Sequence, residues 1–465
     1  MVFLVDLPTD VLREIILHII YNPVDPQRFS KYELLPLASS CQRLREASVE
    51  FLFWSVDIFE ASFGLQHRVL KSSVAFQKFN EVTDTQIGYI RSGVRRLLVR
   101  DRDKTASGDL WSILAKLENL RSLHLDGPFY HEWSAPFPSA TQQLFERKDV
   151  MEKLVNLTLV NVLFASPIWP FIFRRGLFSN LTRIEYLEGD FIENKHPHPF
   201  SAFRSDTEPV FPYLHTFIFT FAPQLPETFD HTLHFLVLHK QTLERLGIRE
   251  KAGHKEFYPI NTPRPPKADN KTAFELSMQC YHRLWDQLGH LSSLKLLALT
   301  DTVIRPGNKP SSRIVLPKLQ GLHLHGHFHG VFMAPGRLSQ LDFNQIPAFL
   351  GSLPSPNVAC GDYTNGNRSW KSPMPSPPYQ WPEKDAHEDQ VMQKWLESSQ
   401  LTRLKTFMRL TENGDVVYRI LQNGNSKEVY TVDSREEKQQ LLNAVGQWSL
   451  AEGSDVEAPF QSVDI

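Results

Sequence analysis

A spaced apolar pattern recurs through the middle of this chain and constrains its fold more than any other feature. An apolar residue is followed by two variable positions, a second apolar residue, one variable position and a third apolar residue, as in residues 120–125 and 154–159. Copies begin at Val94, Leu120, Leu154, Leu181, Leu214, Leu243, Leu294 and Leu319, with a weaker candidate at Leu338. Residues two apart on a strand point the same way, so each copy predicts a short strand with one apolar side.

The pattern matches the strand part of a leucine-rich repeat, L-x-x-L-x-L. One such unit cannot bury its apolar side alone, and stacked units form a continuous core. Helical spacing between the strands, as in Leu110 to Leu117 and Phe274 to Leu288, predicts an α/β solenoid. The intervals between copies vary, so the solenoid is expected to be irregular. An ordinary open α/β domain with parallel strands is the alternative.

The variable strand positions are expected to face outward and to line the concave sheet that such solenoids use for binding. Arginines outnumber acidic residues among these positions, which favours an acidic or phosphorylated ligand. A merely solvated surface is the alternative. The target-binding candidates are Arg96, Arg183, Arg245, Arg249, His323 and His325.

The first sixteen residues contain a second informative stretch, which begins with Leu7 and Pro8. Proline is tolerated in the first turn of a helix, and Asp10 lies near the positive end of the helix dipole. An apolar stripe follows at helical spacing. Two more segments complete the region, Leu34–Arg45 with its Cys-x-Arg-Leu-Arg sequence and Phe51–Val56 with Leu-Phe-Trp.

In order and spacing, residues 4–58 resemble an F-box, a three-helix module that docks on the adaptor subunit of cullin–RING ubiquitin ligases. The sequence departs from the family pattern in the long segment Tyr21–Tyr32 and in Ser40, which stands where an apolar residue commonly precedes the cysteine. A plain helical hairpin is the alternative. The resemblance implies that Leu7, Pro8, Val11, Leu12, Ile15, Ile16 and Leu44 form the adaptor-binding surface or its immediate support.

The C-terminal third differs in composition. Prolines interrupt residues 346–390, which predicts a long loop or insert. Order is expected to return as three strands, with Asn-Gly turns at 413 and 423, and a helix behind a capping box at Ser434–Glu437. The expected organisation is an F-box at 1–60, a linker at 61–93, the solenoid at 94–345, the insert at 346–390, a small cap of meander plus helix at 391–450 and a loose tail at 451–465.

Sequence motifs for catalysis are not evident. The alternating histidines at 323, 325, 327 and 329 could share one strand face and bind zinc, but they also occupy ordinary outward positions of a repeat. The three cysteines lie far apart without C-x-x-C spacing, and neither a Gly-rich phosphate loop nor a G-x-S-x-G elbow is present. We therefore expect a non-enzyme without a metal or another cofactor.

The formal net charge of −2 argues against nonspecific binding to nucleic acid or anionic membranes. The sparse cysteines favour a reducing compartment, so a cytoplasmic or nuclear location is expected. The F-box resemblance implies a substrate receptor, with a ligase adaptor, a cullin held through that adaptor, and an unknown target protein as partners. The alternatives are a protein-interaction scaffold without ligase function and a metal-dependent enzyme using the histidine cluster.

Overall fold

The computed structural model describes part of the chain, and all statements below concern that part. Its ranges are 6–20, 34–59, 93–100, 114, 116–126, 148–160, 176, 178–187, 199–221, 226–250, 270–300, 316, 318, 321–325, 358–362, 393–394, 396–397, 406–410, 416–424 and 426–437. The chain divides into two compact units, one ending at Leu214 and the other beginning at His215. Each unit is described by itself.

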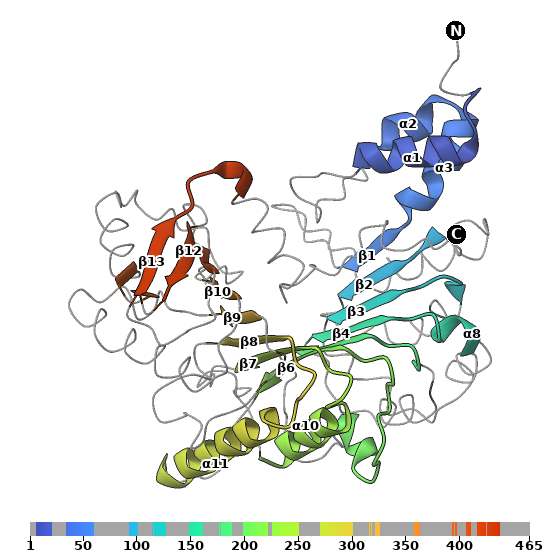
Figure 1. Ribbon diagram of the computed structural model, residues 1–465. Helices are drawn as coiled ribbons and strands as arrows, with labels where there is room; N and C mark the ends of the chain where they lie inside the picture. The colour runs from blue at the N-terminus through green and yellow to red at the C-terminus, as the bar shows by residue number, and fades with distance from the viewer. Residues whose placement is uncertain are drawn as a thin grey trace, which may run out of the picture. The chain divides into compact units, whose positions relative to one another are not determined.

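The first unit begins with a helical module made of α1 (Thr9–Ile20), α2 (Leu34–Ser40) and α3 (Gln42–Leu52) (Figure 1). Pro8 precedes α1, and its carbonyl accepts the first helical hydrogen bond from the Leu12 amide at 3.0 Å. The three helices share one small apolar core. Its buried members are Leu12, Ile16, Leu34, Leu44, Ala47 and Phe51.

Five parallel strands follow in the first unit. They are β1 (Ser55–Phe59), β2 (Arg96–Arg100), β3 (Ser122–Asp126), β4 (Asn156–Val160) and β5 (Arg183–Leu187), each hydrogen-bonded to the next in this order. In β3 and β4 burial alternates along the strand, because the two leucines of each repeat face inward. Helix α8 (Lys148–Met151) precedes β4.

A repeated backbone contact joins these strands. The carbonyl just before each strand accepts hydrogen bonds from two consecutive amides of the next repeat. The Arg95 carbonyl receives the amides of Arg121 and Ser122 at 2.7 and 2.9 Å, and the Arg121 carbonyl receives those of Val155 and Asn156 at 2.8 and 3.0 Å. The repeats therefore share one register, and equivalent residues of successive repeats form straight rows across the strands.

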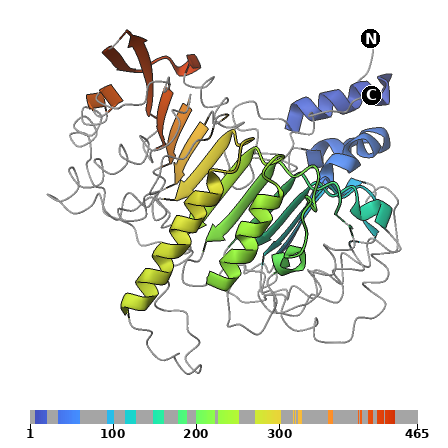
Figure 2. The same cartoon turned by 60° about the horizontal axis from the view of Figure 1, so that its bottom comes forward.

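The second unit continues the same construction. Its parallel strands are β6 (Thr216–Phe221), β7 (Arg245–Glu250), β8 (Leu296–Thr300), β9 (Gly321–His325), β10 (Val358–Asp362) and β11 (Thr406–Leu410). Antiparallel β12 (Val416–Asn423) and β13 (Ser426–Thr431) follow. Helices α10 (Pro226–Leu238) and α11 (Asn270–Leu288) lie beside each other on one face of β6 to β8 (Figure 2).

The chain is thus a mixed α/β protein with stacked parallel strands, consistent with a repeat solenoid. Each of the eight repeats predicted from Val94 to Leu319 forms one strand, β2 to β9. The weaker candidate at Leu338, the helix expected at 441–448 and the tail lie outside the described residues. Of the capping box, the Glu437 amide donates to Ser434 Oγ at 3.3 Å. Two strands were not predicted, β1 and β10, and β10 lies inside the segment interpreted as a proline-rich loop.

His239, at the end of α10, gives the second unit a predictable response to acid. The side chain is 1% exposed, its Nδ1 lies 2.8 Å from the Phe235 carbonyl, and its ring packs on Phe235. Burial lowers its pKa to about 4, although the backbone hydrogen bond raises it in part. An unfolded histidine titrates near pH 6.5, so the fold favours the neutral ring.

We predict that His239 stabilises the fold fully above about pH 6.5 and that this contribution, about 3 kcal/mol, disappears as the pH falls towards 4. His239→Gln stays neutral and should flatten the dependence of the urea midpoint on pH across this window. His290→Gln changes an exposed histidine of the same unit and should leave the dependence as in the parent protein. An equal slope in the parent protein and His239→Gln would contradict the assignment.

Candidate functional site

The residues predicted to bind an adaptor separate into core and surface. Leu12 and Ile16 are 1% exposed and Leu44 is 6% exposed, so these three hold the helices together. Leu7 and Ile15 are partly buried, and Leu7 packs against the same core. Pro8 and Val11 are exposed. The exposed members can contact a partner directly, whereas the buried ones can act only as support.

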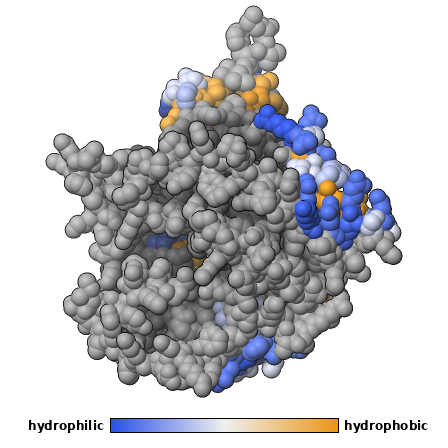
Figure 3. Space-filling view, turned by 90° about the vertical axis from the view of Figure 1, so that its left-hand side faces the viewer, coloured by the Kyte–Doolittle hydropathy of each residue, from blue (hydrophilic) through white to orange (hydrophobic). Residues whose placement is uncertain are grey.

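Leu35 is an exposed apolar residue that is not among the residues predicted to bind the adaptor. It is 52% exposed on α2, and Val11 on α1 is 41% exposed. Leu34 and Ala38 are spaced for one helix face and are buried, which leaves Leu35 and Pro36 on the exposed side. Hydrophobic residues are visible on the surface of the helical module at the top of Figure 3. The signal in the sequence was the run Leu34–Leu37, which contains more apolar residues than one helix face can bury.

The Cys-x-Arg-Leu-Arg segment has a structural explanation. Arg43 donates from Nη2 to the Leu7 carbonyl at 2.7 Å, and Arg45 donates from Nε to the Ala38 carbonyl at 3.1 Å. Cys41 precedes α3, and its Sγ accepts from the Leu44 amide at 3.5 Å. The two arginines therefore hold the start of α1 and the end of α2 against α3. This places Leu7 and Pro8 at a defined position on the module.

The predicted target-binding residues lie at the expected strand positions, but their exposure varies. The register of the first unit places Arg96 and Arg183 in one row that also contains Ser122 and Asn156. Arg96 and Arg245 are partly exposed. Arg249, His323 and His325 lie on their predicted strands, and their side chains are outside the described part of the structure. Target binding by these residues stays a prediction.

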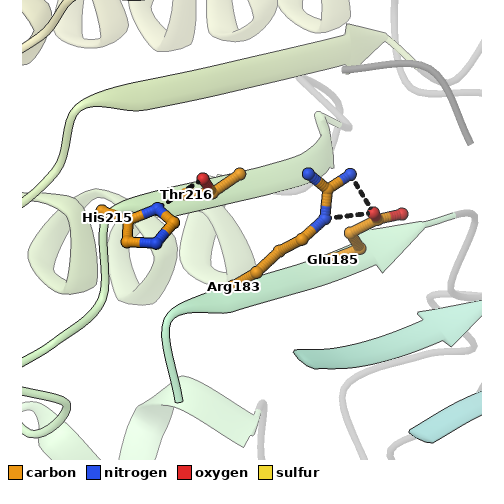
Figure 4. A network of polar contacts seen from close by, with 4 residues as sticks. All are labelled: Arg183, Glu185, His215 and Thr216. Carbon is orange, nitrogen blue, oxygen red and sulfur yellow. Dashed lines mark hydrogen bonds and ion pairs between the residues drawn. The ribbon is translucent and has the colours of Figure 1, made fainter. Parts of the chain in front are cut away.

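Arg183 does not have the exposure expected of a ligand-binding residue. Its side chain is buried on β5 and forms an ion pair with Glu185, two residues along the same strand (Figure 4). Arg183 Nε donates to Glu185 Oε1 at 2.7 Å, and Nη2 donates to the same oxygen. Adjacent outward positions of one strand lie on the same side, which allows this pairing. The expectation of an exposed Arg183 was therefore wrong.

Other outward positions in the two units are buried as well. In the first unit Leu187 on β5 is 1% exposed. In the second unit Thr216, Ile218 and Leu296 are buried, and His215 Nδ1 lies 2.9 Å from Thr216 Oγ1 (Figure 4). The outward positions of β5, β6 and β8 thus contribute to the interior, and most of this face is unavailable to a large ligand there.

Next to Arg183, the opposite side of β5 carries an aromatic cluster. Tyr186 packs edge-to-face on Phe200, with ring centroids 6.0 Å apart, and the contact continues through Phe203 to Phe211. Complete burial raises the pKa of the Tyr186 hydroxyl well above its usual value. The cluster attaches the 3-10 helix η4 (Pro199–Phe203) to the strand, so it is a packing feature rather than a reactive site.

The described residues contain no cluster of three or more histidine, cysteine or acidic side chains that could hold a metal ion. The backbone of β9 places His323 and His325 at alternate positions, and His327 and His329 lie outside the described residues. Within the same described part, no helix has the length and apolar character needed to span a membrane.

Comparisons with known proteins give little further information. A scan against protein-family models found no match, and a search of curated proteins found none. Among solved structures, a match is the crystal structure of a Rad7 and Elc1 complex in yeast. The identity is 14%, the match covers 81% of this chain and 94% of that chain, and the TM-score is 0.28. At this score the likeness carries no conclusion about function.

The buried Arg183–Glu185 pair leads to a prediction about stability. Arg183→Met leaves the Glu185 carboxylate buried without its cation, and we expect a loss of about 3–5 kcal/mol. Arg183→Met with Glu185→Leu should recover most of this loss, because both charges are replaced by apolar groups. Equilibrium unfolding in urea measures both effects.

The control for this experiment is the ion pair of Lys295 with Glu244, 2.6 Å apart, whose side chains are 36% and 41% exposed. Lys295→Met should cost no more than about 1 kcal/mol, since exposed pairs contribute little. A loss in Arg183→Met as small as in the control would show that the β5 pair is solvated.

Proposed function

We propose that this chain is a protein-interaction subunit without catalytic activity of its own, which binds the adaptor of a cullin–RING ubiquitin ligase and presents a target protein. The observation that carries the proposal is the apolar surface of the N-terminal module. Leu12, Ile16 and Leu44 complete the core of the module, whereas Val11 and Leu35 remain exposed. Apolar side chains that a module does not use for its own core are available to a partner.

The arrangement of the helices supports the F-box part of the proposal. It consists of three helices in the predicted order, and Leu7 and Pro8 are held against α3 by the hydrogen bond from Arg43. We therefore assign direct adaptor contact to Pro8, Val11 and Leu35, and partial contact to Leu7 and Ile15. Leu12, Ile16 and Leu44 are assigned to support. In this proposal the strands β2 to β9 form the leucine-rich-repeat domain. The proposed location of the protein in the cell is cytoplasmic or nuclear.

The mechanism of such a receptor is proximity. A target held by the repeats and an adaptor held by the helices are brought together, and the local concentration of target lysines near the ubiquitin-loaded enzyme rises. The receptor needs no reactive group for this role. Its requirement is that both partners are bound at the same time, with a joint between the two binding regions that maintains their separation.

We predict that Val11→Glu combined with Leu35→Glu abolishes co-purification of the adaptor, because both substitutions place a charge in an apolar contact. Truncating a central contact residue of an interface typically costs about 2 kcal/mol or more, and a buried charge costs at least as much. The measurement is affinity purification of the tagged full-length chain from cells that co-express the adaptor, followed by immunoblotting for adaptor and cullin.

Thr9→Glu is the matched control, since it adds the same charge at an exposed polar position of α1. It should retain the adaptor, and all variants should keep the thermal transition of the parent protein. Adaptor capture by the double variant would contradict the assigned surface. Adaptor without cullin in the parent protein would instead favour a scaffold that does not serve a ligase.

A further inference from the structure

An open groove of about 520 Å³ lies along the amino-terminal ends of β3, β4 and β5 in the first unit. Arg121, Val155 and Thr182, each immediately before a strand, form its floor. Lys153, Asn180 and Tyr213, each immediately before the first leucine of a repeat, form its rim. The groove thus follows the repeat direction across three strands, at the strand ends and not on the face formed by the outward strand positions.

The floor is fixed by the backbone ladder. The Val155 amide donates to the Arg121 carbonyl at 2.8 Å, and the Thr182 amide donates to the Val155 carbonyl at 2.8 Å. Adjacent strands are spaced by about 4.8 Å, so Arg121 and Thr182 are separated by about 10 Å at the backbone. A groove of this form accommodates an extended chain that crosses the strands, with side chains directed at successive floor residues.

The rim is fixed by side-chain contacts between repeats. Lys153 Nζ donates to the Glu118 carbonyl at 2.9 Å and lies 3.5 Å from Asn119 Oδ1. Asn180 Nδ2 repeats the arrangement one step along and donates to the Glu152 carbonyl at 2.8 Å. Lys153 and Asn180 are therefore held in place before any ligand binds, and this reduces the entropy that they lose on binding.

The charges of the groove favour an anionic ligand at one end. Glu152 lies in the groove wall and is paired with Lys148 at 3.2 Å. Lys153 Nζ donates to two neutral oxygens, and Arg121 is exposed without a carboxylate partner among the described residues. The charged lining residues are Arg121 and Lys153 against Asp149 and Glu152. Lys148, which does not line the groove, pairs with Glu152 and neutralises it, so Arg121 and Lys153 are opposed by Asp149 alone.

Tyr213 adds an aromatic anchor to the rim. It is 62% exposed, the highest value among the exposed large apolar or aromatic residues of the described structure. Tyrosine and arginine are enriched among the residues that dominate binding energy in protein interfaces, because a large rigid ring loses little entropy on contact. The combination of Tyr213 with Arg121 and Lys153 is suited to a peptide segment with acidic side chains.

We propose that this groove is the binding site for an extended acidic segment of a protein partner. Arg121 and Lys153 pair with carboxylates of the segment, and Tyr213 packs against its chain. The inference rests on the proposed function, because it assigns the place where the receptor holds its target. It places target binding at the strand ends and not at the outward strand positions, since the side chains of Arg183, Glu185 and Leu187 are buried.

The test is fluorescence anisotropy of the purified full-length chain with fluorescein-labelled octaglutamate as the probe. Arg121→Glu should weaken binding about tenfold or more, and Lys153→Gln and Tyr213→Ala about fivefold each, as expected for central interface residues. Glu152→Gln removes a competing carboxylate and should strengthen binding. Raising the salt from about 50 to about 300 mM should weaken it, because the contacts are partly solvent-exposed ion pairs.

Arg204→Glu is the matched control, since it reverses an exposed arginine of the same unit outside the groove, and it should change the affinity less than about twofold. If Arg121→Glu lowers the melting temperature, Arg121→Gln replaces it in the same comparison. Equal affinity of the parent protein and both Arg121 variants overturns the proposal. Equal affinity for a labelled oligothymidylate of the same length also overturns it, because the groove would then bind any polyanion.

Failure of the groove and failure of the ligase assignment are separable. Arg121→Glu should capture the adaptor as the parent protein does, and Val11→Glu with Leu35→Glu should bind octaglutamate as the parent protein does. If the parent protein binds the probe through Arg121 but captures no adaptor, the groove proposal is supported and the ligase role is contradicted. A parent protein that captures the adaptor but shows no Arg121-dependent probe binding rejects the groove alone.

Discussion

The hydrogen bonds that connect successive repeats determine where every other feature of this protein lies. A carbonyl that accepts two consecutive amides of the next repeat permits only one register between neighbouring strands. The contact recurs from Trp54 to Arg95, from Arg95 to Arg121 and onward in the first unit, and from His215 to Glu244 to Lys295 in the second. Shifting one strand by a single residue would exchange the inward leucines with the outward residues. The apolar core and the backbone ladder therefore support the same arrangement.

The sequence predicts which strand residues face inward, but it does not predict which outward residues are exposed. Inward positions follow from spacing alone, so the leucines of β3 and β4 were placed correctly. Exposure of the outward positions depends on what covers them, and a strand pattern contains no information about that. Arg183 and Thr182 are neighbours in sequence, yet Arg183 is buried in an ion pair and Thr182 lines an open groove. The strand β10 was missed because Ala359 and Gly361 stand where the other repeats carry large apolar residues. The strand β1 was missed although Phe53, Val56 and Ile58 have the repeat spacing, because these residues were interpreted as the end of the helical module.

In the helices of the N-terminal module, too, the sequence pattern alone does not show which apolar residues are buried. Val11 and Leu12 are adjacent and both apolar, but successive helical residues are rotated by about 100°, so only one of them can face the core. Periodicity indicates a stripe and does not identify its centre when apolar residues are consecutive. The packing of α1 on α3 decides that Leu12 is buried and Val11 exposed. An exposed apolar residue beside a complete core is informative about function, because the fold itself does not need it there.

The joint between the helical module and the repeats bears directly on the proposed receptor role. Helix α3 ends at Leu52 and β1 begins at Ser55, so only Phe53 and Trp54 separate them. The Trp54 ring stacks on Phe51 of the helical core, and the Arg95 guanidinium lies 5.6 Å from the ring centroid.

The Trp54 carbonyl accepts the amides of Arg95 and Arg96 at 3.0 and 2.9 Å, which makes this residue the first step of the ladder. One residue thus belongs to both the helical core and the repeat array. A proximity mechanism gains most when the link between two binding regions is short and matched to its span, since effective concentration falls as a flexible linker lengthens. Trp54 provides such a short link, because it contacts both the helical core and the first repeat. This double contact is a physical reason for the Leu-Phe-Trp sequence at the junction.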